Sequence, residues 1–183
     1  PSERRRFIDS ELCQLDKVYL HELSSYNKTV LQRNKLLKEI HFRKDYREVL
    51  EILDLQLIKY GREIIRRRTV FVQELNEIIQ EIHQKLSGGQ EQIVLGYEAN
   101  VQEEELEQTL QDHMERDIHL KTTTTGPHRD DLSFLVNDID IRRFGSQGQQ
   151  RTAALSLKLS EIELVKRRVH DTPVLLLDDV LSE

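Results

Sequence analysis

The sequence predicts an α/β fold that carries an inserted, mainly α-helical arm. A long series of apolar residues at helical spacing occupies residues 44–86, and strand-like patterns follow it. Charged residues make up 33% and apolar residues 37% of the 183 positions, a balance typical of a soluble chain rich in exposed helix. No apolar run approaches the roughly 20 residues of a membrane span. We therefore expect a folded, cytoplasmic protein without a membrane segment.

The arm is predicted from helical periodicity. Residues 2–15 and 19–40 each repeat apolar positions at spacings of three and four. The same spacing then runs without a break through Leu50, Leu53, Leu57, Tyr60, Ile64, Phe71, Leu75, Ile78, Ile82 and Leu86. One helix over 44–86 would be on the order of 60 Å long and would need a partner. The helix ending at Ile40 can lie antiparallel to it, so we expect residues 1–15 to join an arm made by residues 16–90.

Glycines end the arm, and a return segment over 91–120 follows. Ser87-Gly88-Gly89 supplies the positive φ that a helix end requires. Residues 93–97 then suggest a strand, and Leu106, Leu110, Met114 and Ile118 predict one amphipathic helix. Leu86-Ser87-Gly88-Gly89-Gln90 matches the signature of transporter ATPases letter for letter. Because a strand pattern follows it instead of a helix, we interpret it as a helix stop and turn.

Residues 121–183 read as part of an α/β domain. Alternation at Leu132, Phe134 and Val136, a turn at Asn137-Asp138, and alternation again at Ile139 and Ile141 predict a β-hairpin. A helix is expected over 149–169. The aliphatic run 174–177 is typical of a strand buried on both faces of a mostly parallel sheet.

Two acids follow that last strand. In open α/β sheets ligands bind at the carboxyl ends of the strands, where Asp178 could hold a hydrated Mg²⁺ and Asp179 could orient or deprotonate an attacking water. An Asp at a strand end can also simply begin a turn. The aliphatic run alone does not decide between these two readings.

A second group lies 32 residues before Asp178, at Ser146-Gln147-Gly148-Gln149. Small residues at a helix start leave backbone N–H groups open to an anion, although many such starts are ordinary N-caps. Turn, long helix and acidic strand in this order are similar to the signature, helix and Walker B strand of ABC-type ATPases. In that resemblance the signature contacts the γ-phosphate of a nucleotide held by the opposite subunit.

Five blocks extend the likeness along the chain. They are Pro1-Ser2-Glu3-Arg4-Arg5-Arg6-Phe7, Gln32-Arg33-Asn34-Lys35-Leu36-Leu37, Thr124-Thr125-Gly126-Pro127-His128-Arg129-Asp130-Asp131, Phe144-Gly145-Ser146-Gln147-Gly148-Gln149-Gln150-Arg151-Thr152, and Leu175-Leu176-Leu177-Asp178-Asp179-Val180-Leu181-Ser182-Glu183. In order and spacing they resemble the RecF family of SMC-like ATPases. The resemblance implies a partial ABC-type ATPase head with an inserted arm.

The resemblance also implies a function. Members of this family bind DNA and ATP, dimerise when ATP is bound, and help RecO and RecR to load RecA at single-strand gaps. By position, Asp178 corresponds to the Walker B acid that holds Mg²⁺ through water and Asp179 to the catalytic carboxylate. Ser146, Gln147, Gly148 and Gln149 correspond to the signature that contacts ATP in trans.

One motif of the family is missing from this sequence. A Gly-x-x-x-x-Gly-Lys-Ser/Thr loop, which cradles the β- and γ-phosphates, occurs nowhere in the 183 residues. We therefore interpret the chain as a fragment. We expect ATP and Mg²⁺ in the complete protein, but neither a bound cofactor nor ATP hydrolysis by this chain alone.

Arginine clusters suggest where DNA is contacted. The candidates are Arg4, Arg5, Arg66, Arg67 and Arg68, although a solvated helix face is the simpler reading of each cluster. An alternative to the enzyme fragment is a stand-alone helical module that binds DNA or a protein partner through these arginines. A transporter ATPase subunit would need residues 86–90 to be a genuine signature. We predict that His83, His113 and His119 are helix-surface residues, and we expect no structural metal.

Overall fold

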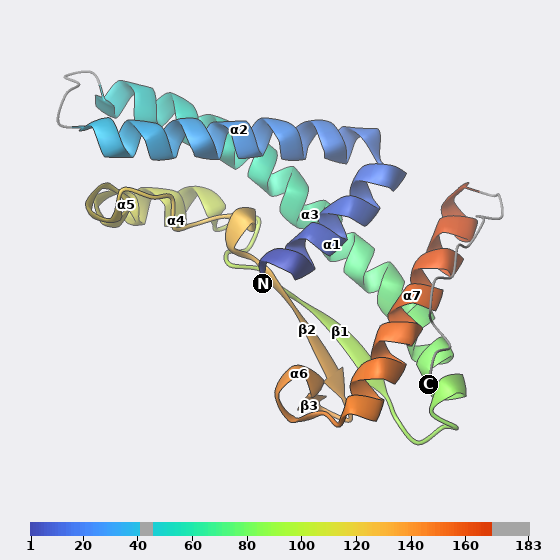
Figure 1. Ribbon diagram of the computed structural model, residues 1–183. Coiled ribbons are helices and arrows are strands. Elements are labelled where there is room, and N and C mark those ends of the chain that lie inside the picture. Colours follow the sequence, from blue (N-terminus) through green and yellow to red (C-terminus); the bar gives the residue numbers. More distant parts are fainter. Residues whose placement is uncertain (41–45, 170–183) are drawn as a thin grey trace.

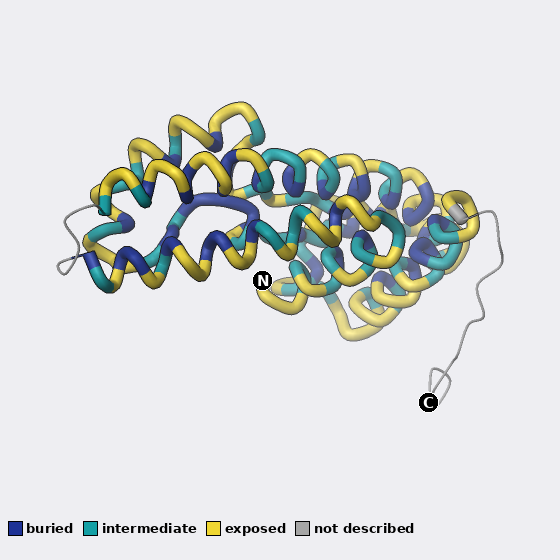
Figure 2. Tube along the Cα trace, turned by 90° about the horizontal axis from the view of Figure 1, so that it is seen from above, coloured by how far each residue is buried: buried dark blue, intermediate teal, exposed yellow. Residues whose placement is uncertain are grey.

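Three helices form the frame of the computed structural model, which describes residues 1–40 and 46–169. They are α1 (Ser2–Leu15), α2 (Lys17–Glu39) and α3 (Tyr46–Leu86). Helix α3 runs unbroken for 41 residues, which confirms the single long helix that the apolar spacing predicts. Helix α2 lies along the first half of α3 (Figure 1), and buried residues follow the facing sides of the helices (Figure 2). The long helix is therefore stabilised by packing along its apolar side.

Asp16 separates α1 from α2. Its backbone is extended, at φ −142° and ψ 104°. Its carboxylate accepts hydrogen bonds from the N–H groups of Val18 and Tyr19, at 2.9 and 3.1 Å. This N-cap satisfies the free donors at the start of α2. The chain consequently turns a corner here, and α1 leaves the arm toward the sheet.

A three-stranded antiparallel sheet follows the arm. Strands β1 (Ile93–Glu98), β2 (Asp131–Val136) and β3 (Ile139–Asp140) are arranged in the order β1-β2-β3. Asn137 and Asp138 adopt φ values of 48° and 64° in the tight turn, which confirms the hairpin. Its second strand is shorter than predicted. Asp140 caps a short helix, α6 (Ile141–Phe144), so Ile141 is helical and not part of the strand.

The predicted helix through Leu106 and Ile118 is wrong in one respect, because the chain forms two short helices. These are α4 (Leu106–Asp112) and α5 (Met114–Leu120), separated at His113. The His113 ring bonds the hydroxyl of Thr125 through Nδ1 at 2.7 Å, and the buried Asp117 pairs with Arg33 of α2 at 2.6 Å. These tertiary contacts hold α4 and α5 beside the arm, where Figure 1 shows them.

Helix α7 (Gln147–Val169) crosses the end of α3 and closes a small core with the sheet. Ala153 packs with Ile79 of α3, Ile93 of β1 and Val136 of β2. The helix predicted over 149–169 is thus confirmed, with a start two residues earlier. The predicted strand 174–177, with Asp178 and Asp179, lies outside the described residues. Among the described helices, none combines the length and the apolar character needed to cross a membrane.

Candidate functional site

The start of α7 is a capping box. The Ser146 hydroxyl accepts a hydrogen bond from the backbone N–H of Gln149 at 3.1 Å, and the Gln149 side-chain oxygen accepts one from the N–H of Ser146 at 3.0 Å. The N–H groups of Gln147 and Gly148 lie in the first turn, where no preceding carbonyl can reach them. They make no hydrogen bond within the described part of the chain. The helix start predicted from the sequence therefore presents free donors.

Gly148 lies in open space. A Cβ at this position would meet only the Ser146 hydroxyl, at 3.8 Å, and the backbone does not adopt positive φ. Neither packing nor backbone conformation thus demands a glycine here. A glycine with room on every side allows another molecule to approach the backbone closely. Together with the free N–H groups and the dipole of a 23-residue helix, this geometry suits an anion such as a phosphate.

Gln149 has a different role from its neighbours. Its side-chain oxygen is used in the capping box, and its Nε2 donates to Oε1 of Glu91 at 3.0 Å. The family resemblance groups Gln149 with the residues expected to contact the nucleotide, whereas the structure uses both ends of its amide internally. Of the four residues, only Ser146, Gln147 and Gly148 therefore keep polar groups that could face an anion.

His83 lies behind this turn. The residue is fully buried, and its ring contacts the Ser156 hydroxyl of α7 at 2.8 Å and Glu91 Oε2 at 3.2 Å. The prediction of a surface histidine is wrong here. His83 comes four residues after Ile79 and three before Leu86, so its position on the apolar side of α3 signals burial.

The sequence Leu86-Ser87-Gly88-Gly89-Gln90 ends α3. Gly88 and Gly89 adopt φ values of 64° and 79°. The N–H groups of Ser87 and Gly89 donate to the carbonyls of His83 and Gln84, both at 2.8 Å, and so satisfy the end of the helix. The interpretation as a helix stop is confirmed. The segment matters for another reason, because it places Glu91 beside the start of α7.

The three arginines at 66–68 point in different directions. Arg66 is exposed and pairs with Glu63 of its own helix at 2.7 Å. Arg67 is bonded to Asp16. Arg68 is buried and donates to Asp130 and Asp9, both at 2.8 Å, and to the carbonyl of Pro127 at 2.7 Å. A DNA-contacting role for Arg68 is therefore wrong.

Successive helix residues are about 100° apart, so three in a row cannot share one face. The signal for Arg68 was present in the sequence. It lies four residues after Ile64 and three before Phe71, within the apolar series of α3.

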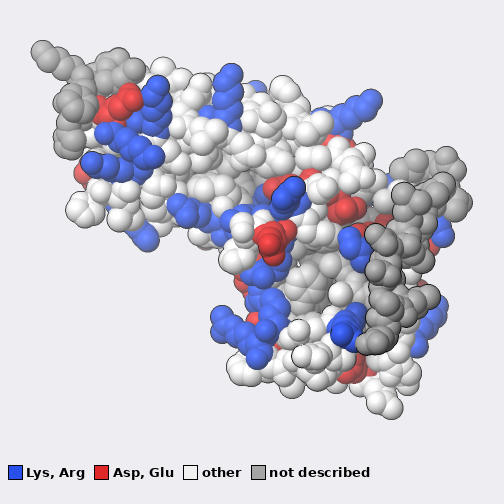
Figure 3. Space-filling view, in the orientation of Figure 1, with Lys and Arg blue, Asp and Glu red and all other residues white. Residues whose placement is uncertain are grey.

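Arg4 and Arg5 are also engaged internally. Arg4 makes two hydrogen bonds to the Asp131 carboxylate, at 2.6 and 2.7 Å, and this lowers the pKa of Asp131 to about 2. Arg5 donates to the carbonyl of Asp130 at 2.6 Å. By contrast, Arg6 and Arg143 are exposed and make no ion pair within residues 1–40 and 46–169. Figure 3 shows a band of basic side chains that runs from the start of α1 toward α6.

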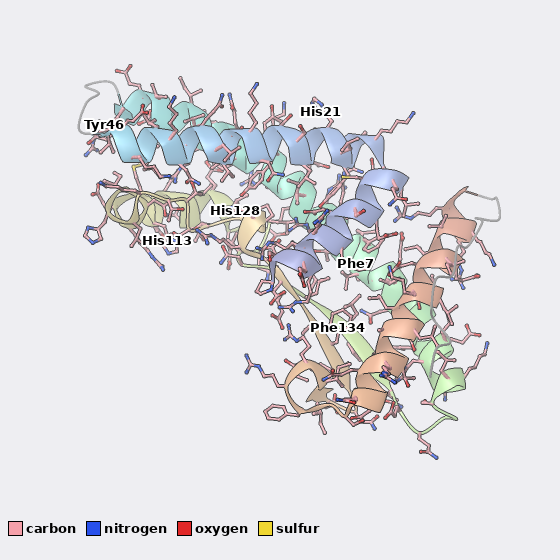
Figure 4. All side chains as sticks on the ribbon, viewed as in Figure 1. Phe7, His21, Tyr46, His113, His128 and Phe134 are labelled. Carbon is pink, nitrogen blue, oxygen red and sulfur yellow. The ribbon has the colours of Figure 1, made fainter. Side chains whose placement is uncertain are left out.

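His128 lies in the short 3-10 helix η2 (Pro127–Arg129), between the arm and the sheet (Figure 4). Its Nδ1 is 2.8 Å from the Tyr26 hydroxyl, and its Nε2 is 3.0 Å from the carbonyl of Thr123. Burial lowers the pKa of His128 to about 4. The neutral ring thus accepts from Tyr26 and donates to Thr123. It forms one wall of a cavity of about 260 Å³ whose other walls include Arg5, Arg6 and Asn27.

Comparisons with known proteins cover the whole chain. No family model matches it. The DNA replication and repair protein RecF of Agathobacter rectalis is 60% identical over 183 residues, which are 100% of this chain and 51% of the relative. RecF of Lachnoclostridium phytofermentans shows the same identity and coverage. RecF of Halalkalibacterium halodurans is 48% identical over 193 residues, 100% of this chain and 52% of the relative.

The comparison with solved structures points to the same protein as the comparison of sequences. The recombination mediator protein RecF-ATP of the RecFOR pathway matches with a TM-score of 0.93 and 38% identity over 100% of this chain and 51% of that protein. RecF-ATPrS matches with the same TM-score and identity, and 52% of that protein is covered. The chain thus spans about half the length of the relatives it matches. Over its whole length the chain is similar to RecF in sequence and in fold, and it corresponds to about half of a RecF protein.

Proposed function

We propose that this chain is the part of an ATP-dependent DNA replication and repair protein that supplies the signature half of a composite ATP site. One observation carries the proposal. The capping box at Ser146 and Gln149 leaves the N–H groups of Gln147 and Gly148 without partners among residues 1–40 and 46–169, at the start of a 23-residue helix. The likeness to RecF-ATP, whose structure matches over the whole chain, supports ATP as the anion.

Each residue of the turn has a definite part in this function. The Gln147 and Gly148 N–H groups would donate to oxygens of a terminal phosphate, and the Ser146 hydroxyl has a hydrogen to donate as well. Because these donors lie on an exposed turn, the nucleotide would be held mainly by a second subunit and only capped by this one. ATP would therefore stabilise a homodimer.

Hydrolysis would need residues beyond this turn. By resemblance Asp178 would hold Mg²⁺ through water and Asp179 would act on the attacking water. The sequence contains no Gly-x-x-x-x-Gly-Lys-Ser/Thr loop, so the 183 residues alone should neither bind ATP tightly nor hydrolyse it.

DNA contact is assigned to the basic band near the start of α1 and α6. Arg6 and Arg143 are exposed there, whereas Arg4, Arg5, Arg67 and Arg68 are held by internal partners. Exposed arginines without an acidic partner can bind phosphates without first breaking an ion pair. In the complete protein we propose that this contact serves the loading of RecA at single-strand gaps with RecO and RecR, in the bacterial cytoplasm.

A chimera tests the ATP role. These 183 residues would replace the matching half of Agathobacter rectalis RecF, and dimerisation would be measured by sedimentation with and without ATP. Ser146→Ala should weaken the ATP-dependent dimer about tenfold, since it removes one hydroxyl contact and half of the capping box. A control substitution at the exposed Glu104 should have no effect. If the Ser146 variant dimerises like the parent, the turn does not contact the nucleotide.

A further inference from the structure

A side chain near the end of the arm contacts the residue that caps the 146–148 turn. Glu91 lies five residues beyond the end of α3, and its two carboxylate oxygens contact different elements. Oε1 accepts from Gln149 Nε2 of α7 at 3.0 Å, while Oε2 lies 3.2 Å from His83 Nε2 in the last turn of α3. The Glu91 side chain therefore connects the end of α3 with the start of α7.

The connection extends into the turn itself. Gln149 can donate to Glu91 through Nε2 while its oxygen accepts from the N–H of Ser146. The amide is planar, so fixing its nitrogen also fixes its oxygen and the backbone of Ser146. The free N–H groups of Gln147 and Gly148 directly follow that residue. The orientation of the anion-facing donors is thus linked to the position of the Glu91 carboxylate.

On the arm side, His83 is held by a hydrogen bond with Ser156 of α7. The Ser156 hydroxyl donates to the carbonyl of Thr152 at 2.8 Å, so it is left to accept from His83 Nδ1. The other ring nitrogen, Nε2, lies 3.2 Å from Glu91 Oε2. His83 is fully buried, so the arm end of this link cannot move without repacking α3 against α7.

We propose that Glu91 is a positioning residue. It sets the geometry of the phosphate-facing 146–148 turn through Gln149 and ties that geometry to the end of the arm helix through His83. This inference rests on the proposed ATP role of the turn and adds a route by which the arm controls it. A change at the arm that shifts the end of α3 would move Glu91 and thereby weaken the cap on a nucleotide held by the opposite subunit.

The test uses the same RecF chimera with ATPγS as the ligand and two readouts. The first is the dissociation constant of the ATPγS-dependent dimer. The second is the affinity for ATPγS at dilutions where the protein is monomeric, which reports the subunit's own phosphate-binding loop. Glu91→Ala should weaken the dimer about tenfold, as for loss of a charge-assisted hydrogen bond, and leave the monomer affinity unchanged.

A conservative variant distinguishes positioning from a general loss of folding. In Glu91→Gln the amide oxygen can still accept from Gln149, and the amide nitrogen takes the place of the carboxylate oxygen that faces His83. Dimerisation should therefore stay within about threefold of the parent. Glu104→Ala is the matched control, because Glu104 is exposed and makes no side-chain hydrogen bond within the described residues.

The outcomes separate the two proposals. If Ser146→Ala weakens the dimer and Glu91→Ala does not, the positioning role is wrong while the ATP role stands. If Glu91→Ala lowers monomer affinity as much as dimerisation, Glu91 is only structural and the inference is overturned. Should neither Ser146→Ala nor Glu91→Ala change dimerisation, the proposed ATP role itself fails.

Discussion

Arg68 and Asp130 form an ion pair inside the protein. Arg68 Nη1 lies 2.8 Å from Asp130 Oδ2, and the two side chains are 2% and 1% exposed. Arg68 belongs to the arm helix α3, whereas Asp130 directly precedes strand β2. Asp9 of α1 accepts from the same guanidinium, and the Tyr97 hydroxyl of β1 bonds to Asp130. The pair thus joins the arm helix to the start of β2 in the protein interior.

Removing the Arg68 side chain should destabilise the whole protein. Arg68→Ala leaves the Asp130 carboxylate buried without its cation, and loss of one partner of a buried pair costs about 3–5 kcal/mol. We expect this loss in the free energy of unfolding measured with urea. Arg66→Ala, two positions away on the exposed side of α3, should change it by less than about 0.5 kcal/mol. Equal effects of the two substitutions would contradict the buried role of Arg68.

His128 should make stability fall in acid. Its folded pKa is about 4, below the ordinary value of 6.5, so the contribution is complete above pH 6.5 and is lost as the pH falls toward 4. The full difference corresponds to about 3 kcal/mol. We expect His128→Gln to be less stable than the parent at pH 7, with a difference that shrinks between pH 6.5 and 4. A constant difference over this range would show that the ring is not buried in its neutral form.

Glu161 should have the opposite effect on the pH dependence of stability, because its contribution is lost as the pH rises. Burial raises its pKa to about 7, and its Oε1 has no hydrogen-bond partner within the described residues. A carboxyl group with a raised pKa stabilises fully below its unfolded value of 4.5, and this contribution is lost as the pH rises to 7. Glu161→Gln should therefore stabilise the protein by about 1–2 kcal/mol at pH 8 and have little effect at pH 4.5. Thermal unfolding at the two pH values measures this, and a loss of stability at pH 8 would rule out the buried carboxylate.

DNA binding should depend on Arg6 and Arg143. Each phosphate contact adds about one unit to the slope of log affinity against log salt concentration, so Arg6→Ala and Arg143→Ala should each reduce that slope by about one. Fluorescence anisotropy with duplex DNA at several salt concentrations gives the slope. Arg66→Ala is the comparison, because Arg66 already pairs with Glu63. A larger effect at Arg66 would place the DNA on the arm instead.

Local sequence patterns were enough to predict an element wherever residues within that element determine its shape. The apolar spacing predicts α3, Gly88 and Gly89 predict its end, and Asn137-Asp138 predict the hairpin, because periodicity and turn chemistry act over a few neighbouring residues. The capped turn at Ser146 also follows from adjacent residue types.

Polar residues inside the core were harder to predict. The burial of Arg68 depends on Asp9 and Asp130, 59 and 62 positions away, and that of His83 depends on Ser156, 73 positions away. Likewise, the break between α4 and α5 at His113 comes with a bond to Thr125 on the following loop. A sequence pattern does not show which distant partner will satisfy a buried charge. The positions of Arg68 and His83 on the apolar side of α3 nevertheless indicated that both are buried.

Gly148 offers the most direct test of the composite ATP site. A Cβ there meets only the Ser146 hydroxyl, at 3.8 Å, so Gly148→Ala should fold as the parent does, yet its methyl group would occupy the space needed by a phosphate. In the RecF chimera we predict at least a tenfold weaker ATP-dependent dimer, with unchanged thermal stability and unchanged ATP affinity of the monomer. An ATP-dependent dimer as tight as that of the parent would contradict the assignment of this turn to the nucleotide.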